Sequence, residues 1–333
     1  MKALLSTAVG GPDTLTIGEV AEPVPTAGQV VVDVHACAIN FPDTLIIEDK
    51  YQFRPARPFS PGADVAGVVS ALGEGVTGLS VGDRVMACTT HGGLAEKIAI
   101  NAAACHALPA NRSYAEGAAM VMTYGTSIHA LIDRGHLKAG ETLLVLGAAG
   151  GVGIAAVEIG KALGARVIAA VSSEEKAALA RAAGADDCLV YPYAPFDKDQ
   201  SKALAEAFKD VVGPGGANVI YDAVGGDYAE PALRSIAWEG RYLVVGFPAG
   251  IPRLPLNLTL LKSCDVCGVF WGAYTMRDAE GNRAHFRQLQ AWWDEGKISP
   301  RVTATYPFER GGEAIAALGN RQAAGKLVVT IRE

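Results

Sequence analysis

The chain has 333 residues, which is enough for two domains of ordinary size, and half of them are hydrophobic. A formal net charge of −6 argues against nucleic acid or an anionic membrane surface as a main partner. Glycines interrupt the N-terminus before a signal-peptide core forms, and no apolar run approaches the roughly 20 residues of a membrane helix. These features predict a soluble, cytoplasmic protein.

Residues 1 to about 125 predict a β-rich region without a long helical period. Apolar or alternating runs that are typical of strands lie at 30–39, 63–72 and 81–88, and glycine turns separate them. Several short strands with such turns indicate an irregular barrel or sandwich.

From about Thr126 the pattern changes to strands that alternate with helices. The expected strands span 142–146, 165–171, 188–191, 217–224, 241–247 and 265–271. The expected helices between them span 152–163, 174–183, 199–211 and 228–237. This alternation predicts an α/β fold with a doubly wound, parallel, six-stranded sheet. After about Gly272 come an expected helix at 283–295 and a final strand at 326–333, and we expect this tail to return to the first domain.

The first strand of the second region leads through a glycine-rich turn into a helix. In that context, backbone N–H groups and the helix dipole bind a pyrophosphate. The fingerprint Gly-x-Gly-x-x-Gly would begin at position 148, which is Ala148. We predict phosphate binding by Gly150, Gly151 and Val152, the alternative being a turn that only packs the helix against the strand.

The segment after the second strand bears on the choice of cofactor. Glu174 and Glu175 lie near the distance at which an acidic residue binds the ribose of NAD. However, Ser172 to Glu175 fits a capping box, in which the glutamate folds back onto the helix start. Because a hydroxyl at Ser172 and a cation at Lys176 suit a 2′-phosphate, we favour NADPH over NADH.

Six motifs together resemble a known family. They lie in order at 38–44, 60–69, 81–85, 125–131, 147–153 and 221–227. In this order they are similar to the zinc-free quinone oxidoreductase branch of the medium-chain dehydrogenase/reductase superfamily. The resemblance implies a GroES-like catalytic domain from residues 1–125 and 272–333, with an NADPH-binding Rossmann domain at 126–271 inserted between them.

The same resemblance makes a prediction about metal. Zinc-dependent members carry a Cys, a Gly-His-Glu triplet and a second Cys around a catalytic zinc. The matching positions here hold Asn40, the triplet Gly62-Ala63-Asp64, and Met122. These positions offer no thiolate or imidazole ligand set, so we expect catalysis without metal.

The resemblance also suggests roles for individual residues. Asn40 and Thr126 would lie near the nicotinamide, Asp43 would fix the loop that holds Asn40, and Tyr51 would line the substrate cleft. Further expected cofactor contacts are Tyr191 near the 2′-phosphate, Gly246, Phe247, Phe270 and Trp271 at the ends of the last two strands, and Lys326. The alternatives are structural: turn caps for Asn40 and Asp43, a helix N-cap for Thr126, packing for Tyr51, and a helix-capping or solvated role for Lys326.

Three functions fit this reading. Without zinc, hydride transfer to a conjugated acceptor is favoured, because the negative charge that forms spreads to a distant oxygen and needs only hydrogen bonds. The first is an NADPH:quinone reductase, and the second reduces an enone or a 2-enoyl-CoA, for which Arg54, Arg57 and Arg253 are the available cations. The third is an NADPH-binding protein with a structural or sensing role. The apolar strand at 265–271 would be a sheet edge, which predicts pairing in a homodimer.

Overall fold

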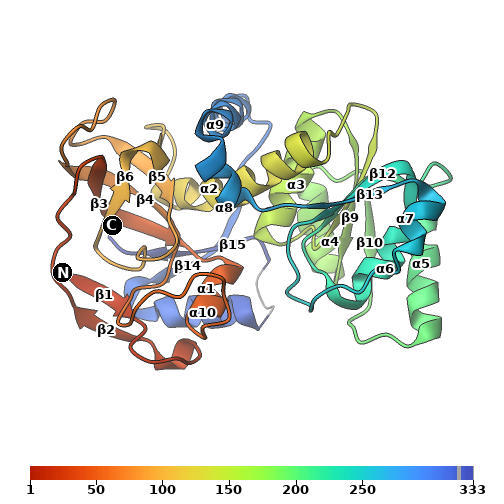
Figure 1. The fold of residues 1–333 in the computed structure, drawn as a ribbon, viewed down its shortest axis with the longest axis horizontal. Helices are drawn as coiled ribbons and strands as arrows, with labels where there is room; N and C mark the ends of the chain where they lie inside the picture. The colour runs from red at the N-terminus through yellow and green to blue at the C-terminus, as the bar shows by residue number, and fades with distance from the viewer. Residues whose placement is uncertain (321–323, 333) are drawn as a thin grey trace. The chain divides into compact units, whose positions relative to one another are not determined.

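The computed structural model describes residues 1–320 and 324–332 and divides into two compact units (Figure 1). The β-rich unit comprises Met1–Met122 and Pro300–Glu333, and the Rossmann unit comprises Thr123–Ser299. Within the described residues, we find no helix of sufficient length and apolarity to cross a membrane. The cytoplasmic location stays a prediction.

The β-rich unit is built on a seven-stranded sheet in the order β14-β15-β3-β4-β5-β7, with β6 also paired to β3. Its strands are β3 (Gln29–Ala38), β4 (Asp64–Leu72), β5 (Arg84–Cys88), β6 (Lys97–Asn101), β7 (Cys105–Ala107), β14 (Val302–Pro307) and β15 (Lys326–Thr330). A separate pair joins β1 (Lys2–Leu5) to β2 (Thr16–Glu19). The short helices are η1 (Pro12–Thr14), α1 (Phe41–Ile46), η2 (Ala102–Ala104), η5 (Phe308–Arg310) and α10 (Gly311–Gly319). Because β15 pairs with β3, segments from both ends of the sequence share one sheet and one core.

The Rossmann unit contains a six-stranded sheet in the order β10-β9-β8-β11-β12-β13, and every pair in it is parallel. Its strands are β8 (Thr142–Leu146), β9 (Arg166–Val171), β10 (Asp187–Val190), β11 (Ala217–Asp222), β12 (Ile236–Val244) and β13 (Asp265–Gly268). Its helices are α3 (Gly151–Ala162), α4 (Glu174–Ala182), α5 (Lys198–Val212), η4 (Gly226–Tyr228), α6 (Ala229–Leu233) and α7 (Asn257–Lys262). The strand order reverses between β8 and β11, as in doubly wound nucleotide-binding folds. The predicted fold class is confirmed.

One helix was not predicted from the sequence. Helix α2 (Tyr114–Ile128), followed by the π-helical turn η3 (His129–Arg134), occupies a stretch for which no helical period was expected. Most of its residues are buried, so its apolar residues do not gather on one face and leave no amphipathic pattern.

The last part of the Rossmann unit also differs from expectation. Strand β13 ends at Gly268, and Phe270 and Trp271 begin helix α8 (Trp271–Arg277) instead of ending a strand. Residues 272–299, expected in the first domain, cluster with the Rossmann unit. Stacking of Tyr274 on His129 and of α8 against α9 (Ala279–Asp294) accounts for this grouping.

Candidate functional site

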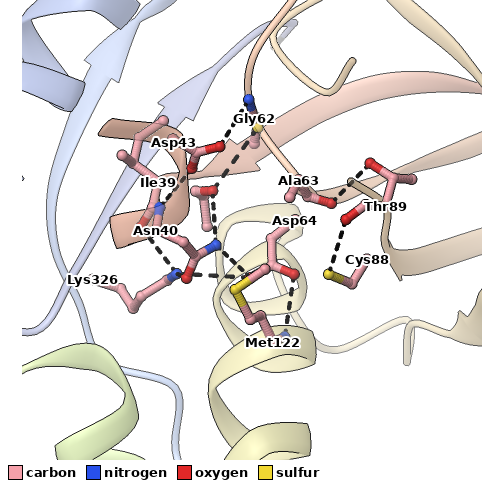
Figure 2. A network of polar contacts seen from close by, with 12 residues as sticks. Ile39, Asn40, Asp43, Gly62, Ala63, Asp64, Cys88, Thr89, Met122 and Lys326 are labelled. Carbon is pink, nitrogen blue, oxygen red and sulfur yellow. Dashed lines mark hydrogen bonds and ion pairs between the residues drawn. The ribbon is translucent and has the colours of Figure 1, made fainter. Parts of the chain in front are cut away.

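A buried polar network lies in the β-rich unit where three strands meet (Figure 2). The register places Ala38 of β3 opposite Asp64 of β4 on one side and Val328 of β15 on the other. Asn40 follows two residues later, so Asp64 and Lys326 flank its side chain. The sheet register therefore gathers groups that are far apart in the sequence.

The side-chain amide of Asn40 is fully engaged inside this network. Its Nδ2 donates to Asp64 Oδ2 at 2.9 Å, and its Oδ1 accepts from Lys326 Nζ at 2.6 Å. The residue is only 6% exposed. The structure thus gives the polar atoms of the Asn40 side chain partners within the protein.

Asp43 anchors the main chain around Asn40. One oxygen accepts the Asn40 N–H at 2.7 Å, and the other accepts the Gly62 N–H at 3.0 Å. Burial raises the pKa of Asp43 to about 6, although both N–H donors and the Lys326 charge act against that shift. The expectation that Asp43 holds the Asn40 loop agrees with these two bonds.

Lys326 is buried among these groups. Its ammonium also donates to the Ile39 carbonyl at 3.1 Å and lies 3.7 Å from Asp64 Oδ2. Burial lowers the pKa of Lys326, and the charges of Asp64 and Asp43 oppose that shift. The structure therefore favours neither a helix-capping nor a solvated role for this lysine.

Asp64 is a member of the network that sequence reasoning did not propose. It is fully buried, and its Oδ1 accepts the Met122 N–H at 3.2 Å. Burial raises its pKa, while the Lys326 charge and the Asn40 amide act against the increase. The sequence analysis used the Gly62-Ala63-Asp64 triplet only for its missing histidine, and the triplet gave no sign of the partners of Asp64.

Tyr51 and Thr126 have fewer contacts. Tyr51 packs against the core of the β-rich unit, with its ring 5.9 Å from that of Phe53, and burial raises its pKa. Thr126 is half-buried in the last turn of α2, which contradicts the alternative role of a helix N-cap.

The glycine turn of the Rossmann unit forms as a tight strand-to-helix connection. Gly147 adopts φ +69°, and a Cβ on Gly153 would lie 2.1 Å from the Gly147 carbonyl oxygen, so both positions require glycine. Ala148 is fully buried, so its methyl group is part of the packing of this turn. Gly150 is the exposed N-cap of α3. The next N–H groups, from Gly151 and Val152, have no acceptor in the helix and suit an anion.

A hydroxyl and a cation lie at the end of β9, as expected, but a different serine caps the helix that follows. Ser173, not Ser172, caps α4 by accepting the Lys176 N–H. Ser172 is left to accept a hydrogen bond from Lys176 Nζ at 3.1 Å and one from Tyr193 OH at 3.4 Å. The helix cap therefore lies one residue later than expected, and because the residue three positions after it is Lys176, the predicted capping box with Glu175 is wrong.

Two tyrosines follow β10 and differ in exposure. Tyr191, the expected phosphate neighbour, is 6% exposed and packs on Tyr228, and burial raises its pKa. Tyr193, which sequence reasoning missed, is 64% exposed and contacts Ser172. The only signal for Tyr193 in the sequence was its position two residues after Tyr191.

The carboxyl ends of the last two strands are only partly as expected. Phe247 and Phe270 are exposed, and the Gly246 N–H donates to the Asp222 carbonyl. Trp271, by contrast, is buried, and its Nε1 donates to Asn282 at 3.0 Å. Trp271 therefore fills the interior between α8 and α9.

Two further buried residues hold the loops at the strand ends. The Asp222 carboxylate accepts the N–H groups of Val224 and Gly225, each at 2.8 Å. Ser127 donates to the Val152 carbonyl at 2.9 Å and thereby ties α2 to the glycine turn. Both lie within the motifs at 221–227 and 125–131, although the sequence gave no reason to select them.

In the described part of the chain, no three His, Cys, Asp or Glu side chains are grouped so that they could hold a metal ion.

Comparison with known proteins identifies the family. Residues 26–110 match the alcohol dehydrogenase GroES-like domain, and residues 151–284 match the zinc-binding dehydrogenase domain. The chain is 37% identical to quinone oxidoreductase-like protein 2 of Rattus norvegicus (96% of this chain, 89% of the relative) and 31% identical to the quinone oxidoreductase of Homo sapiens (94% and 92%). A crystal structure of Escherichia coli quinone oxidoreductase complexed with NADPH superimposes with a TM-score of 0.90 at 28% identity, covering 99% of this chain and 100% of that one. The chain is therefore an oxidoreductase that belongs to the quinone oxidoreductase family of the medium-chain dehydrogenase/reductase superfamily.

Proposed function

We propose that this protein is a zinc-independent, NADPH-dependent reductase of quinones, with the β-rich unit as its catalytic domain. The observation that carries the proposal is the buried ammonium of Lys326. It lies 3.7 Å from Asp64, at the triplet where zinc-dependent members have a ligand, so the site already contains its own cation. Relatives along nearly the whole chain carry the name quinone oxidoreductase, which supports the acceptor class.

The residues of the Rossmann unit fit NADPH. The N–H groups at the start of α3 are suited to the pyrophosphate. Ser172 and Lys176 hold a hydroxyl and a cation together at 3.1 Å, which suits a 2′-phosphate. Glu174 and Glu175 are exposed on the first turn of α4, after the Ser173 cap, and Glu174 lies 3.9 Å from Arg181.

When bound, NADPH supplies a hydride to the acceptor. The chain's contribution is to position groups and to donate hydrogen bonds. The hydroxyl of Tyr51 stays protonated at neutral pH because burial raises its pKa, so it is able to donate to the acceptor oxygen. Asp43 and Lys326 hold Asn40 in place without themselves reaching outward.

An acceptor screen tests this function. With NADPH, we expect steady loss of nicotinamide absorbance with 1,4-benzoquinone or 9,10-phenanthrenequinone, slower loss with crotonyl-CoA, and no change after dialysis against a chelator. Faster turnover of crotonyl-CoA would establish the enoyl-CoA alternative instead, and tight NADPH binding without turnover would establish a sensing role. Stoichiometric zinc in the active protein would contradict zinc independence.

One observation weighs against a CoA substrate. Of the three arginines expected to serve it, Arg57 is engaged within its own unit. Its guanidinium lies 2.8 Å from Asp49, donates to the Ile47 carbonyl and stacks over Phe59. Arg54 and Arg253 are exposed.

We also propose that two copies pair through β13. This strand ends the six-stranded sheet, and Val266 on it is exposed, as are Leu260 and Leu261 on α7. An unpaired edge with apolar side chains has to be covered, and pairing with a second copy continues the sheet across a two-fold axis. Light scattering should give the mass of a dimer for the wild type and of a single chain for Val266→Lys. Val190→Lys on β10, at the opposite edge of the sheet, is the control that should remain dimeric.

A further inference from the structure

The carboxylate of Asp64 has no part in the chemistry described so far, although it is fully buried. We propose that Asp64 is a positioning residue, which fixes the Asn40 amide directly and through Lys326, and that it thereby sets the rate of hydride transfer. The inference rests on the proposed function, because it assumes that Asn40 borders the reacting groups.

The first step concerns charge. The ammonium of Lys326 has two carboxylates nearby, Asp64 and Asp43. Asp64 Oδ2 forms the ion pair with this ammonium, at 3.7 Å from Nζ. Asp64 is also the charge that most opposes the fall in the pKa of Lys326, ahead of Asp43. We therefore take Asp64 as the counter-ion of the lysine. A buried ammonium without such a partner is strongly unfavourable.

The second step concerns the orientation of the amide. An ammonium has only donors, and a carboxylate has only acceptors. Asn40 directs its oxygen to Lys326 and its Nδ2 to Asp64. If the amide were reversed, its NH₂ group would face the ammonium and its oxygen would face the carboxylate, so both bonds would be lost. Asp64 and Lys326 together therefore allow one orientation.

The third step links this orientation to catalysis. The side chain of Asn40 points into the network (Figure 2). The position of the whole residue therefore depends on its hydrogen bonds with Asp64 and Lys326. A displacement of about 1 Å in a group that positions the reactants costs about 100-fold in rate. In Asp64→Asn the ion pair with Lys326 is lost, and the one remaining side-chain oxygen cannot accept from both Asn40 Nδ2 and the Met122 N–H.

The experiment compares Asp64→Asn with Asp33→Asn. Asp33 lies on the neighbouring strand β3 but forms ion pairs at the surface with Arg332 and Lys97, which makes it a matched control. With NADPH and 9,10-phenanthrenequinone, we expect kcat to fall about 100-fold in Asp64→Asn. The Kd for NADPH should change far less, because its phosphate contacts belong to the Rossmann unit. Asp33→Asn should keep the wild-type kcat.

A pH profile separates positioning from simple loss of structure. Without Asp64, Lys326 loses its charge at lower pH, so the alkaline fall in kcat should begin earlier in Asp64→Asn and stay unchanged in Asp33→Asn. The titratable groups that face Lys326 are Asp64 on β4, Asp43 on α1, Cys37 on β3 and Cys88 on β5. An unshifted alkaline limb in Asp64→Asn would overturn the proposal.

A double variant covers the case in which Asp64→Asn folds poorly. Asp64→Asn/Lys326→Met removes both buried charges, so its Tm should rise above that of Asp64→Asn while its kcat stays low. Recovery of kcat together with Tm would show that Asp64 only supports the fold and would overturn the inference. Failure of the wild type to reduce any acceptor would instead refute the proposed function, and this inference with it.

Discussion

The two units treat their polar groups in opposite ways. In the β-rich unit, Asn40, Asp64 and Lys326 are each less than 10% exposed and bind one another. In the Rossmann unit, Ser172 and Lys176 are only half-buried, and both Lys176 and the exposed Tyr193 contact Ser172. The first group satisfies its own hydrogen bonds, whereas the hydroxyl and ammonium groups of the second are partly exposed to solvent.

This difference separates positioning from binding. A buried network whose hydrogen bonds are all satisfied holds one arrangement and has few free polar groups for a ligand. The free-energy cost of burying its charges appears as shifted pKa values. The charges of a half-exposed cluster cost little free energy in the absence of a ligand, and they form strong hydrogen bonds when a charged ligand binds. Mutations should therefore affect stability and its pH dependence in the first unit and ligand affinity in the second.

The largest expected effect is at the glycine turn, where one substitution should reduce both the stability of the fold and the binding of NADPH. In Gly153→Ala the new methyl group would meet the Gly147 carbonyl oxygen at 2.1 Å, so the helix cannot approach the strand end. We expect the free energy of unfolding to fall by about 3 kcal/mol or more and NADPH binding to be lost. Chemical denaturation and NADPH titration measure the two effects.

Gly150→Ala is the matched control for this change. Its Cβ would have no neighbour closer than 3.4 Å, so the fold should keep its stability while NADPH binding weakens at the exposed helix start. Equal loss of stability in both variants would contradict the geometric explanation.

The next prediction tests how much free energy the buried carboxylate of Asp43 costs the folded protein. The pKa of Asp43 is about 6 in the folded protein and 3.8 ordinarily, so between these pH values the folded state holds a proton that the unfolded state has released. The contribution of Asp43 to stability is therefore present at low pH and falls as pH rises through this window, by up to about 3 kcal/mol. Asp43→Asn should abolish this part of the slope and, because Asn40 loses its anchor, lower kcat.

The unfolding free energy measured from pH 4 to pH 7 decides this prediction. Asp33→Asn, at a half-exposed position of the same sheet, should retain the wild-type slope. An unchanged slope in Asp43→Asn would mean that another group titrates there.

The smallest effect concerns the half-exposed cluster alone. Lys176→Ala should raise the Kd for NADPH about 10-fold, because a hydrogen bond to a charged group is lost, and should leave the Kd for NADH unchanged. Tm should stay near the wild-type value. Lys202→Ala on α5 is the control, since this exposed lysine has no assigned role. A similar loss for both cofactors would place Lys176 away from the 2′-phosphate.

Local patterns were sufficient for most of the fold and for one half of the candidate site. Short apolar runs and glycine turns predicted the parallel sheet, and the hydroxyl and cation at Ser172 and Lys176 lie four residues apart in the sequence. Helix α2 was not predicted because it is buried on most sides, and a helix without a polar face has no amphipathic period in its sequence. The capping serine was misplaced by one residue, which is an ordinary error at a helix end.

The other half of the site depends on pairing across the chain. Lys326 and Asn40 are separated by 286 residues, and the antiparallel registers of β15 and β4 on β3 bring them together. The resemblance selected Asn40, Asp43 and Lys326, but nothing local indicated that Asp64 would bind both Asn40 and Lys326. Such contacts follow from strand register, which a single sequence specifies only weakly.

The pairing of β15 with β3 has a consequence for biosynthesis. The Rossmann unit is one continuous stretch, Thr123–Ser299, so every strand of its sheet is synthesised before β14 and β15. The β-rich unit begins earlier but must wait for its last two strands, and Lys326 is the first residue of the final one. Domains generally fold as units during synthesis. The unit that starts first is therefore completed last, and until Lys326 arrives Asp64 has no counter-ion.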